Sequence, residues 1–368
     1  MDGNKSLVSV LVTTYNRIDL LKRNLTKIRG QSYSHLEIIV VDDCSSDETE
    51  SYMRQVALED RRINYIRNQE NVAKVYGDRA HMHAFLKEYS TGDYIVWICD
   101  DDYWVSNELI KDQVEFLDEN SDAVMIIGSQ LSCFGDGANE IPVVSDENLS
   151  DIMDNYQSTN SLPRYEFFNK VHEKSKMTSP EFLESFCRDP MRCNIICGAM
   201  LYRKSFFLES GAISSTEGSR WQAGYEMIVG PGHFGSVGYI NYPCIVVDVR
   251  AANASFGGTQ YEHYKDSLKS VELAHENAWK SHKMSVSMEY SIKTREKLVR
   301  KISQTFLRNS CTYLETGELT LCTEENVSRL VGVKDILKQY WKYRIIPHGR
   351  DLVLSIKFML LSLRKSKQ

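Results

Sequence analysis

Three consecutive aspartates, Asp100, Asp101 and Asp102, follow an apolar run from Tyr94 to Ile98. Carboxylates this close repel one another unless a cation neutralises them. Their hard oxygen atoms suit Mg²⁺ or Mn²⁺, and Mg²⁺ sites often combine one or two carboxylates with substrate phosphates. The triplet therefore predicts a divalent metal site. The alternative is a solvated turn that caps the following helix.

Two more polar clusters follow apolar runs in the same way. Thr14-Tyr15-Asn16-Arg17 comes after the β-branched run from Leu7 to Thr13, and Asp42-Asp43 comes after Leu36 to Val41. Asp42 could accept hydrogen bonds from a ribose or a base, or it could cap a turn. Which of the two applies depends on whether the clusters meet in one cleft.

Strand-like and helix-like patterns alternate along the first 130 residues. Strands are predicted at 7–13, 36–41, 63–66, 94–98 and 123–127. Ser45 and Glu48 have the spacing of a capping box, which predicts a helix starting just after Ser45. Alternation of this kind favours a parallel, Rossmann-like sheet, in which ligands bind outside the carboxyl ends of the strands. All three clusters are therefore expected to line one cleft.

Composition excludes several classes of protein. The chain has 368 residues, 42% of them hydrophobic, and a net charge of −6, which is typical of a folded globular protein and not of a disordered one. Its nine cysteines lack the paired spacing of a zinc site, so reduced thiols are expected. No run approaches the roughly 20 apolar residues of a spanning helix, and residues 1–5 lead directly into a strand. These features predict a cytoplasmic protein.

Charge is unevenly distributed. Residues 331–368 contain nine Lys or Arg and two Asp, a charge of +7, which leaves −13 on residues 1–330. An acidic body with a basic tail does not fit a nucleic-acid partner. Apolar residues between Arg350 and Arg364 allow two interpretations of 350–368: peripheral contact with the inner face of the cell membrane, or a helix docked on the body.

Three segments in register resemble the successive signatures of family 2 glycosyltransferases of GT-A fold, of the type that builds bacterial surface polysaccharides. They are Val8–Arg17, Glu37–Asp47 and Gly92–Trp104. The resemblance implies an α/β fold with a Rossmann-like, mostly parallel central sheet flanked by helices. It also implies a nucleotide-sugar-binding half at 1–130, an acceptor-binding half at 131–260 and a helical extension with a basic amphipathic tail at 261–368.

The resemblance also implies roles for single residues. It places the nucleotide-sugar donor against Thr14, Tyr15, Asn16, Asp42, Arg79, Asp100 and Asp101. Asp100 and Asp102 form the D-x-D pattern that would hold Mn²⁺ or Mg²⁺. A second alignment, anchored on Trp104, puts Cys99 at the first Asp of a D-x-D-D-x-W pattern. Asp102 is a metal ligand in both alignments.

The segment Trp221–Val229 resembles the part of the family that carries the general base, and this makes Glu226 the candidate. Read without the family, Glu226 is an ordinary surface or capping residue. The implied reaction is inverting transfer of a sugar from a nucleotide-diphosphate donor, such as a UDP-sugar, to a hydroxyl of a glycan or lipid-linked acceptor in cell-surface polysaccharide synthesis. The alternatives are a GT-A-like nucleotidyltransferase and a non-catalytic, Mg²⁺-binding receiver-like module ending near residue 125.

Overall fold

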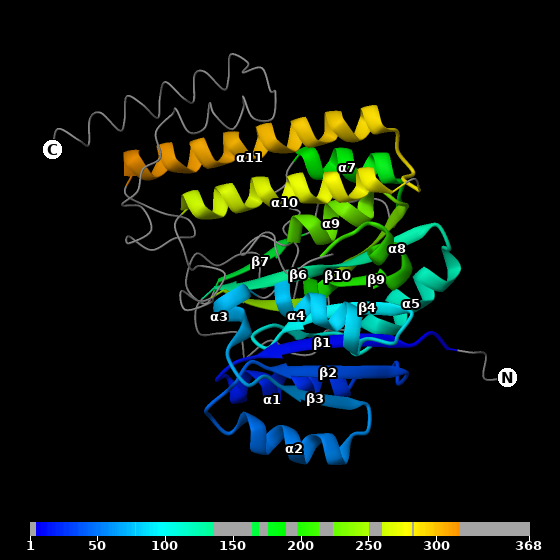
Figure 1. The fold of residues 1–368 in the computed structure, drawn as a ribbon, viewed down its shortest axis with the longest axis vertical. Helices are drawn as coiled ribbons and strands as arrows, with labels where there is room; N and C mark the ends of the chain where they lie inside the picture. The colour runs from blue at the N-terminus through cyan, green and yellow to red at the C-terminus, as the bar shows by residue number, and fades with distance from the viewer. Residues whose placement is uncertain are drawn as a thin grey trace.

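The computed structural model describes residues 5–77, 79–134, 164–168, 176–188, 197–213, 224–249, 260–281 and 283–316. Within them a central sheet is flanked by helices, which confirms the predicted α/β class (Figure 1). The strand order along the sheet is β3-β2-β1-β4-β9-β6-β10-β5, with β7 paired to β6 and β8 paired to β10.

The first four strands are parallel, as predicted. They are β1 (Val8–Thr14), β2 (Leu36–Asp42), β3 (Ile63–Arg67) and β4 (Tyr94–Cys99). In β1, β2 and β4 nearly all side chains are buried on both faces of the sheet, because helices cover both sides, whereas in the edge strand β3 only Ile63 is buried. Those helices are α1 (Ile18–Arg29), α2 (Thr49–Glu59), α3 (Val72–Tyr76), α4 (Arg79–Ala84), the π-helical turn η1 (Phe85–Tyr89) and α5 (Leu109–Glu119).

Beyond β4 the same sheet continues with mixed pairing. Strand β9 (Met200–Arg203) lies between β4 and β6 (Ala123–Phe134) and is antiparallel to both. β10 (Ser236–Val249) then runs parallel to β6, and the short β5 (Tyr103–Trp104) pairs with its far edge. The remaining strands are β7 (Arg164–Phe168) and β8 (Lys176–Met177). A receiver-like module ending near residue 125 does not fit a sheet that continues through β9, β6 and β10.

Helices of the second half stack on one side of this mixed region. They are α7 (Ser179–Arg188), the 3-10 turn η2 (Cys197–Ala199), α8 (Lys204–Glu209), α9 (Gly224–Gly232), α10 (Gln260–Lys280) and α11 (Met288–Thr316). α10 packs on α9, and α11 packs on α10 and α7, at the end of the molecule opposite α2 (Figure 1). No helix in the described ranges is long and apolar enough to cross a membrane. The predicted tail, 350–368, lies outside the described residues.

A buried histidine pair fixes the packing of α9 against α10 and α11. The rings of His233 and His275 are edge to face, with centroids 4.9 Å apart. His233 Nδ1 donates to the Val229 carbonyl at 2.7 Å, and its Nε2 accepts from the Ser291 hydroxyl at 2.9 Å. The Ser291 oxygen in turn accepts from the Trp279 indole at 2.7 Å. With donation in this direction His233 is neutral, which is the form that burial favours.

The His233 ring makes the protein sensitive to acid. Burial is the main reason that the pKa of His233 is lowered to about 4, whereas an unfolded histidine titrates near ~6.5. Between these values the unfolded chain binds a proton at this residue and the folded chain does not. The free energy of unfolding therefore falls as the pH drops, by on the order of 3 kcal/mol.

Urea unfolding of the wild type and His233→Asn, between about pH 7 and about pH 4.5, measures this contribution. In the variant, the free energy of unfolding should no longer include the fall with decreasing pH that His233 causes. The variant is also less stable than the wild type at neutral pH. His35→Asn, at an exposed position, is the control and should keep the wild-type slope. If the free energy of unfolding changed equally with pH in the wild type and in the His233 variant, the prediction would be contradicted.

Candidate active site

The predicted clusters meet at one edge of the sheet because the strands before them are parallel and in register. Thr14 is the register partner of Asp42, and Thr13 is the partner of Cys99. The Thr14 hydroxyl donates to Asp100 Oδ2 at 2.8 Å, which links the loop after β1 directly to the loop after β4. The carboxyl ends of β1, β2 and β4 therefore lie together at one edge of the sheet, as the sequence predicts.

Asn16 joins the loops after β1 and β2. Its backbone has a φ of 52°, a left-handed conformation that asparagine tolerates better than most residues. The Asn16 N–H donates to Ser45 Oγ at 2.9 Å, and the Asn16 side-chain oxygen accepts from the Ser46 N–H at 2.7 Å. Asn16 therefore holds the loop, while the neighbouring residue Tyr15 is 46% exposed.

The expected capping box is wrong, because the Ser45 hydroxyl serves the loop contact instead. Helix α2 starts at Thr49, and Asp47 Oδ1 accepts its N–H at 3.0 Å.

Asp42, which ends β2, and Asp43, which follows it, are both engaged within the protein. Asp42 is fully buried; its Oδ1 accepts from the Ser45 N–H at 2.8 Å and its Oδ2 from the Tyr65 hydroxyl at 2.7 Å. Burial, followed by this hydrogen bond, raises the pKa of Tyr65. A nucleotide would have to compete with these partners for Asp42, and its contact with the donor stays a prediction.

Asp43 fixes the start of α3. Its two carboxylate oxygens accept the N–H groups of Val72 and Ala73 at 2.8 and 2.9 Å, in the first turn of that helix. His81 Nε2 lies 3.4 Å from Asp43 Oδ2. Burial alone would raise the pKa of Asp43, but hydrogen bonds from His81, Asn68 and Ala73 outweigh it and lower the pKa to about 2. The sequence placed Asp43 in the cluster without assigning it this role.

The aspartate triplet is divided between two sets of partners. Asp100 turns toward Thr14 and Arg17, whose guanidinium lies 3.2 Å from Asp100 Oδ1 and 2.9 Å from Asp101 Oδ2. Burial, and then the charge of Asp101, raise the pKa of Asp100 to about 6 against the opposing effects of Arg17 and Thr14. Sequence reasoning missed Arg17 as a site residue, although it lies inside the first motif.

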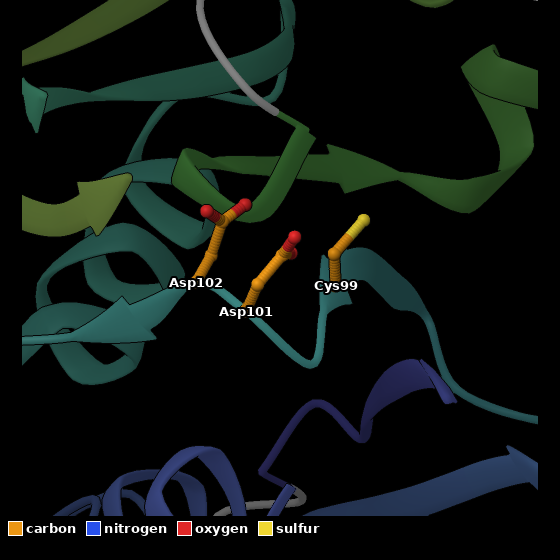
Figure 2. Close-up of side chains that lie close together, drawn as sticks. All are labelled: Cys99, Asp101 and Asp102. Carbon is orange, nitrogen blue, oxygen red and sulfur yellow. The ribbon is translucent and has the colours of Figure 1, made fainter. Parts of the chain in front are cut away.

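Asp101 and Asp102 gather with Cys99, and Asp101 also shares Arg17 with Asp100. The ligand atoms of Cys99, Asp101 and Asp102 all lie within 4.8 Å of one another. Figure 2 shows the three side chains rising to the same side of the chain after β4. Two carboxylates and a thiol are a donor set that fits a divalent metal. This grouping agrees with the alignment anchored on Trp104, in which Cys99 takes the first Asp position and Asp101 and Asp102 form the pair. The role of Asp100 as a metal ligand stays a prediction.

Polar side chains from α1 hold this loop in place. Asn24 Nδ2 donates to the carbonyls of Cys99 and Asp102 at 3.0 and 2.7 Å, and Arg23 donates to the Asp101 carbonyl at 2.6 Å. Asn24 is fully buried. The backbone under the metal-ligand candidates is therefore fixed by bonds that do not depend on a metal.

Trp104 connects the acidic loop to the second half of the sheet. Its buried indole donates to the Gly198 carbonyl in η2 at 2.7 Å. A Cβ at Gly198 would lie 2.7 Å from Ile245 Cδ1 and 2.9 Å from Ile98 Cγ1, so only glycine lets η2 approach this closely. The local sequence pattern does not predict this contact between Trp104 and Gly198.

The candidate base, Glu226, meets a predicted donor-binding residue. Glu226 in α9 and Arg79 in α4 form an ion pair with 2.6 Å between Oε1 and Nη1. The two side chains are 0% and 2% exposed. The Glu226 backbone N–H donates to Ser270 Oγ of α10 at 3.2 Å. The roles of Glu226 as base and of Arg79 as a donor contact stay predictions, but the two residues lie together.

Residues 9–209 match the model of the glycosyl transferase family 2, and the chain belongs to this family. The TuaG protein of Bacillus subtilis, named for teichuronic acid biosynthesis, is 33% identical over 131 residues, which are 36% of this chain and 50% of that protein. A GalNAc(5)-diNAcBac-PP-undecaprenol β-1,3-glucosyltransferase of Campylobacter jejuni is 34% identical over 102 residues, 28% of this chain and 32% of that protein. The chain therefore spans half or less of these relatives.

Among solved structures, residues 1–349 of TarS from S. aureus in complex with UDP-GlcNAc superpose with a TM-score of 0.57 at 12% identity, covering 98% of this chain and 92% of that one. This likeness shows the GT-A fold that the sequence resemblance implies.

Proposed function

We propose that the protein is an inverting glycosyltransferase that moves a sugar from a UDP-sugar to a hydroxyl of a glycan or lipid-linked acceptor in cell-surface polysaccharide synthesis. The observation that carries the proposal is the convergence of Thr14, Arg17, Asp101 and Asp102 at the carboxyl ends of β1 and β4. The exposed Tyr15 ring beside them offers a surface for a base. The fold shared with the TarS complex with UDP-GlcNAc supports a UDP-sugar as donor.

In this proposal a divalent metal, Mn²⁺ or Mg²⁺, is held by carboxylates of the acidic loop: Asp102, the ligand common to both alignments, with Asp101 or Asp100 beside it. When bound, it supplies positive charge against the negative charge that develops on the departing diphosphate. Arg17 is 30% exposed and lies beside the acidic group, where its guanidinium adds to that positive charge. Thr14 and Asn16 shape the donor side of the cleft through the loop contacts described above.

Glu226 is the proposed general base, which removes the proton from the acceptor hydroxyl as that oxygen attacks the sugar. Because its carboxylate is buried against Arg79, this action requires the ion pair to open. A nucleotide diphosphate is an anion that could compete with Glu226 for Arg79. Residues 1–130 then bind the donor, 131–260 bind the acceptor, and 261–368 form the helical extension.

The names of the relatives support a lipid-linked acceptor. The Campylobacter jejuni protein is named for an undecaprenol diphosphate acceptor, as is an Escherichia coli relative, WfaP, which is 33% identical over 112 residues. Such an acceptor would place the enzyme at the inner face of the cell membrane, with 350–368 as its proposed membrane contact.

A panel of UDP-, GDP- and dTDP-sugars with Mn²⁺ tests the proposed donor. A ligand at 100 times its dissociation constant raises the free energy of unfolding by about 2.7 kcal/mol, so the true donor should raise the melting temperature clearly. Slow hydrolysis should release the nucleoside diphosphate. No shift with any UDP-sugar would contradict the proposal, and release of pyrophosphate from a nucleoside triphosphate and a sugar phosphate would indicate the nucleotidyltransferase instead.

A further inference from the structure

Cys99 ends β4 at the point where the metal-ligand candidates begin. Its side chain is half-buried, and its Sγ belongs to the compact group with the carboxylates of Asp101 and Asp102 (Figure 2). The backbone under it is fixed: the Cys99 carbonyl accepts from Asn24 Nδ2 at 3.0 Å and from the Asp102 N–H at 3.3 Å. The sheet register with Thr13 fixes Cys99 from the other side.

Asp100 is poorly placed to complete this group. Its Oδ2 accepts from Thr14 at 2.8 Å and its Oδ1 faces Arg17 at 3.2 Å, so both oxygens point toward the loop after β1. Asp101 also contacts Arg17, through Oδ2 at 2.9 Å, but it lies within the group that contains Cys99. The third donor beside the two carboxylates is therefore a sulfur atom. A thiolate differs from a carboxylate in softness, and this difference decides which cations a site favours.

We propose that Cys99 is a ligand of the divalent metal and makes the site prefer transition-metal ions, such as Mn²⁺, Co²⁺ or Zn²⁺, over Mg²⁺. This inference rests on the metal use stated in the proposed function. The thiol loses its proton to solvent as the sulfur–metal bond forms, because only the thiolate binds. Asp101 and Asp102 supply the oxygen ligands, and Mg²⁺, which favours oxygen, gains nothing from the sulfur.

The chain offers a matched control cysteine. Cys44 lies in the loop after β2 and is also half-buried, but its Sγ faces the Gln69 carbonyl at 3.5 Å and lies outside the metal-ligand group. Cys44→Ser therefore removes a similar thiol from the same edge of the sheet. Cys99→Ser removes the proposed ligand with the least change in size.

Titration of the full chain with Co²⁺, with and without UDP, tests the assignment by absorption. A thiolate bound to Co²⁺ gives a charge-transfer band in the near ultraviolet that carboxylates do not give. The wild type and Cys44→Ser should show this band, and Cys99→Ser should lack it. Cys99→Ser should also bind Co²⁺ more weakly, by at least the roughly 10- to 100-fold that loss of a hydrogen-bond partner of a ligand costs, while its Mg²⁺ affinity stays near that of the wild type. Circular dichroism and thermal unfolding confirm that each variant is folded.

The possible results separate this inference from the proposed function. A wild type that binds Co²⁺ without the band, or a Cys99→Ser variant that keeps the band or the wild-type affinity, overturns Cys99 as a ligand even if sugar transfer is observed. Absence of any divalent-ion binding overturns it as well. A band lost only in Cys99→Ser, in a protein that turns over no nucleotide-sugar, supports the ligand and contradicts the proposed function.

Discussion

Replacing Arg79 with methionine is expected to lower the free energy of unfolding by about 3–5 kcal/mol, because a buried carboxylate loses the cation beside it. The pair joins α4 to α9 over 2.6 Å, and the Glu226 and Arg79 side chains are 0% and 2% exposed. Water therefore cannot replace the guanidinium without a rearrangement of the core. Urea unfolding of the full chain, at a pH near neutrality, measures the change.

A double-mutant cycle identifies the source of this loss. Glu226→Met should also be strongly destabilising, whereas Arg79→Met combined with Glu226→Met should recover much of the stability, because apolar side chains can replace a buried ion pair. Lys293 and Glu289 form an exposed pair, and Lys293→Met, the control, should leave stability unchanged. Additive losses in the double variant would contradict a specific pairing. If Glu226 is also the base, a folded Glu226→Gln variant, which keeps Arg79, turns over about 10²–10⁴-fold more slowly.

Replacing Asp102 with asparagine is expected to reduce metal-dependent transfer by roughly 10³-fold, since metal ions supply several kcal/mol of charge stabilisation and each ~1.4 kcal/mol is tenfold in rate. The variant keeps the size of the side chain and removes one anionic ligand. Initial rates over a Mn²⁺ titration, with EDTA as the metal-free reference, measure the effect.

Asp100→Asn distinguishes the two alignments of the acidic motif. Asp100 faces Thr14 and Arg17, outside the Cys99–Asp101–Asp102 group, so its replacement should change the Mn²⁺ dependence much less than the Asp102 replacement does. A larger shift in Mn²⁺ dependence for Asp100→Asn would favour the D-x-D pair Asp100 and Asp102. Full activity of the Asp102 variant in EDTA would remove the metal from the mechanism.

Strand positions and the meeting of the polar clusters could be predicted because both depend on local pattern. Apolar runs such as 36–41 are long enough to specify buried parallel strands, and parallel strands bring their carboxyl ends to one edge. The contacts within that edge could not be predicted. Asp100 and Asp102 are two residues apart, yet Thr14 and Arg17 draw only the first toward them, and this choice depends on side chains more than 80 positions away in the chain.

The buried ion pair between Arg79 and Glu226 could not be predicted either, because it joins distant parts of the chain. No periodicity relates α4 to α9, so the sequence placed Arg79 and Glu226 on opposite sides of the reaction without indicating their contact. The predicted capping box was wrong for a similar reason. Serine is a common helix cap, but the Ser45 hydroxyl accepts from the Asn16 N–H, a partner 29 positions away that the local sequence does not show.

The position of β9 makes the two halves inseparable as folding units. Tyr94 and Ile95 of β4 pair with Arg203 and Tyr202 of β9, which in turn pairs with β6. A fragment cut at residue 130 would leave β4 as an unprotected sheet edge, open to pairing with other chains and to aggregation. An exchange of the segment after residue 130 between relatives, by recombination or by design, must therefore carry its own β9 and match the edge of β4.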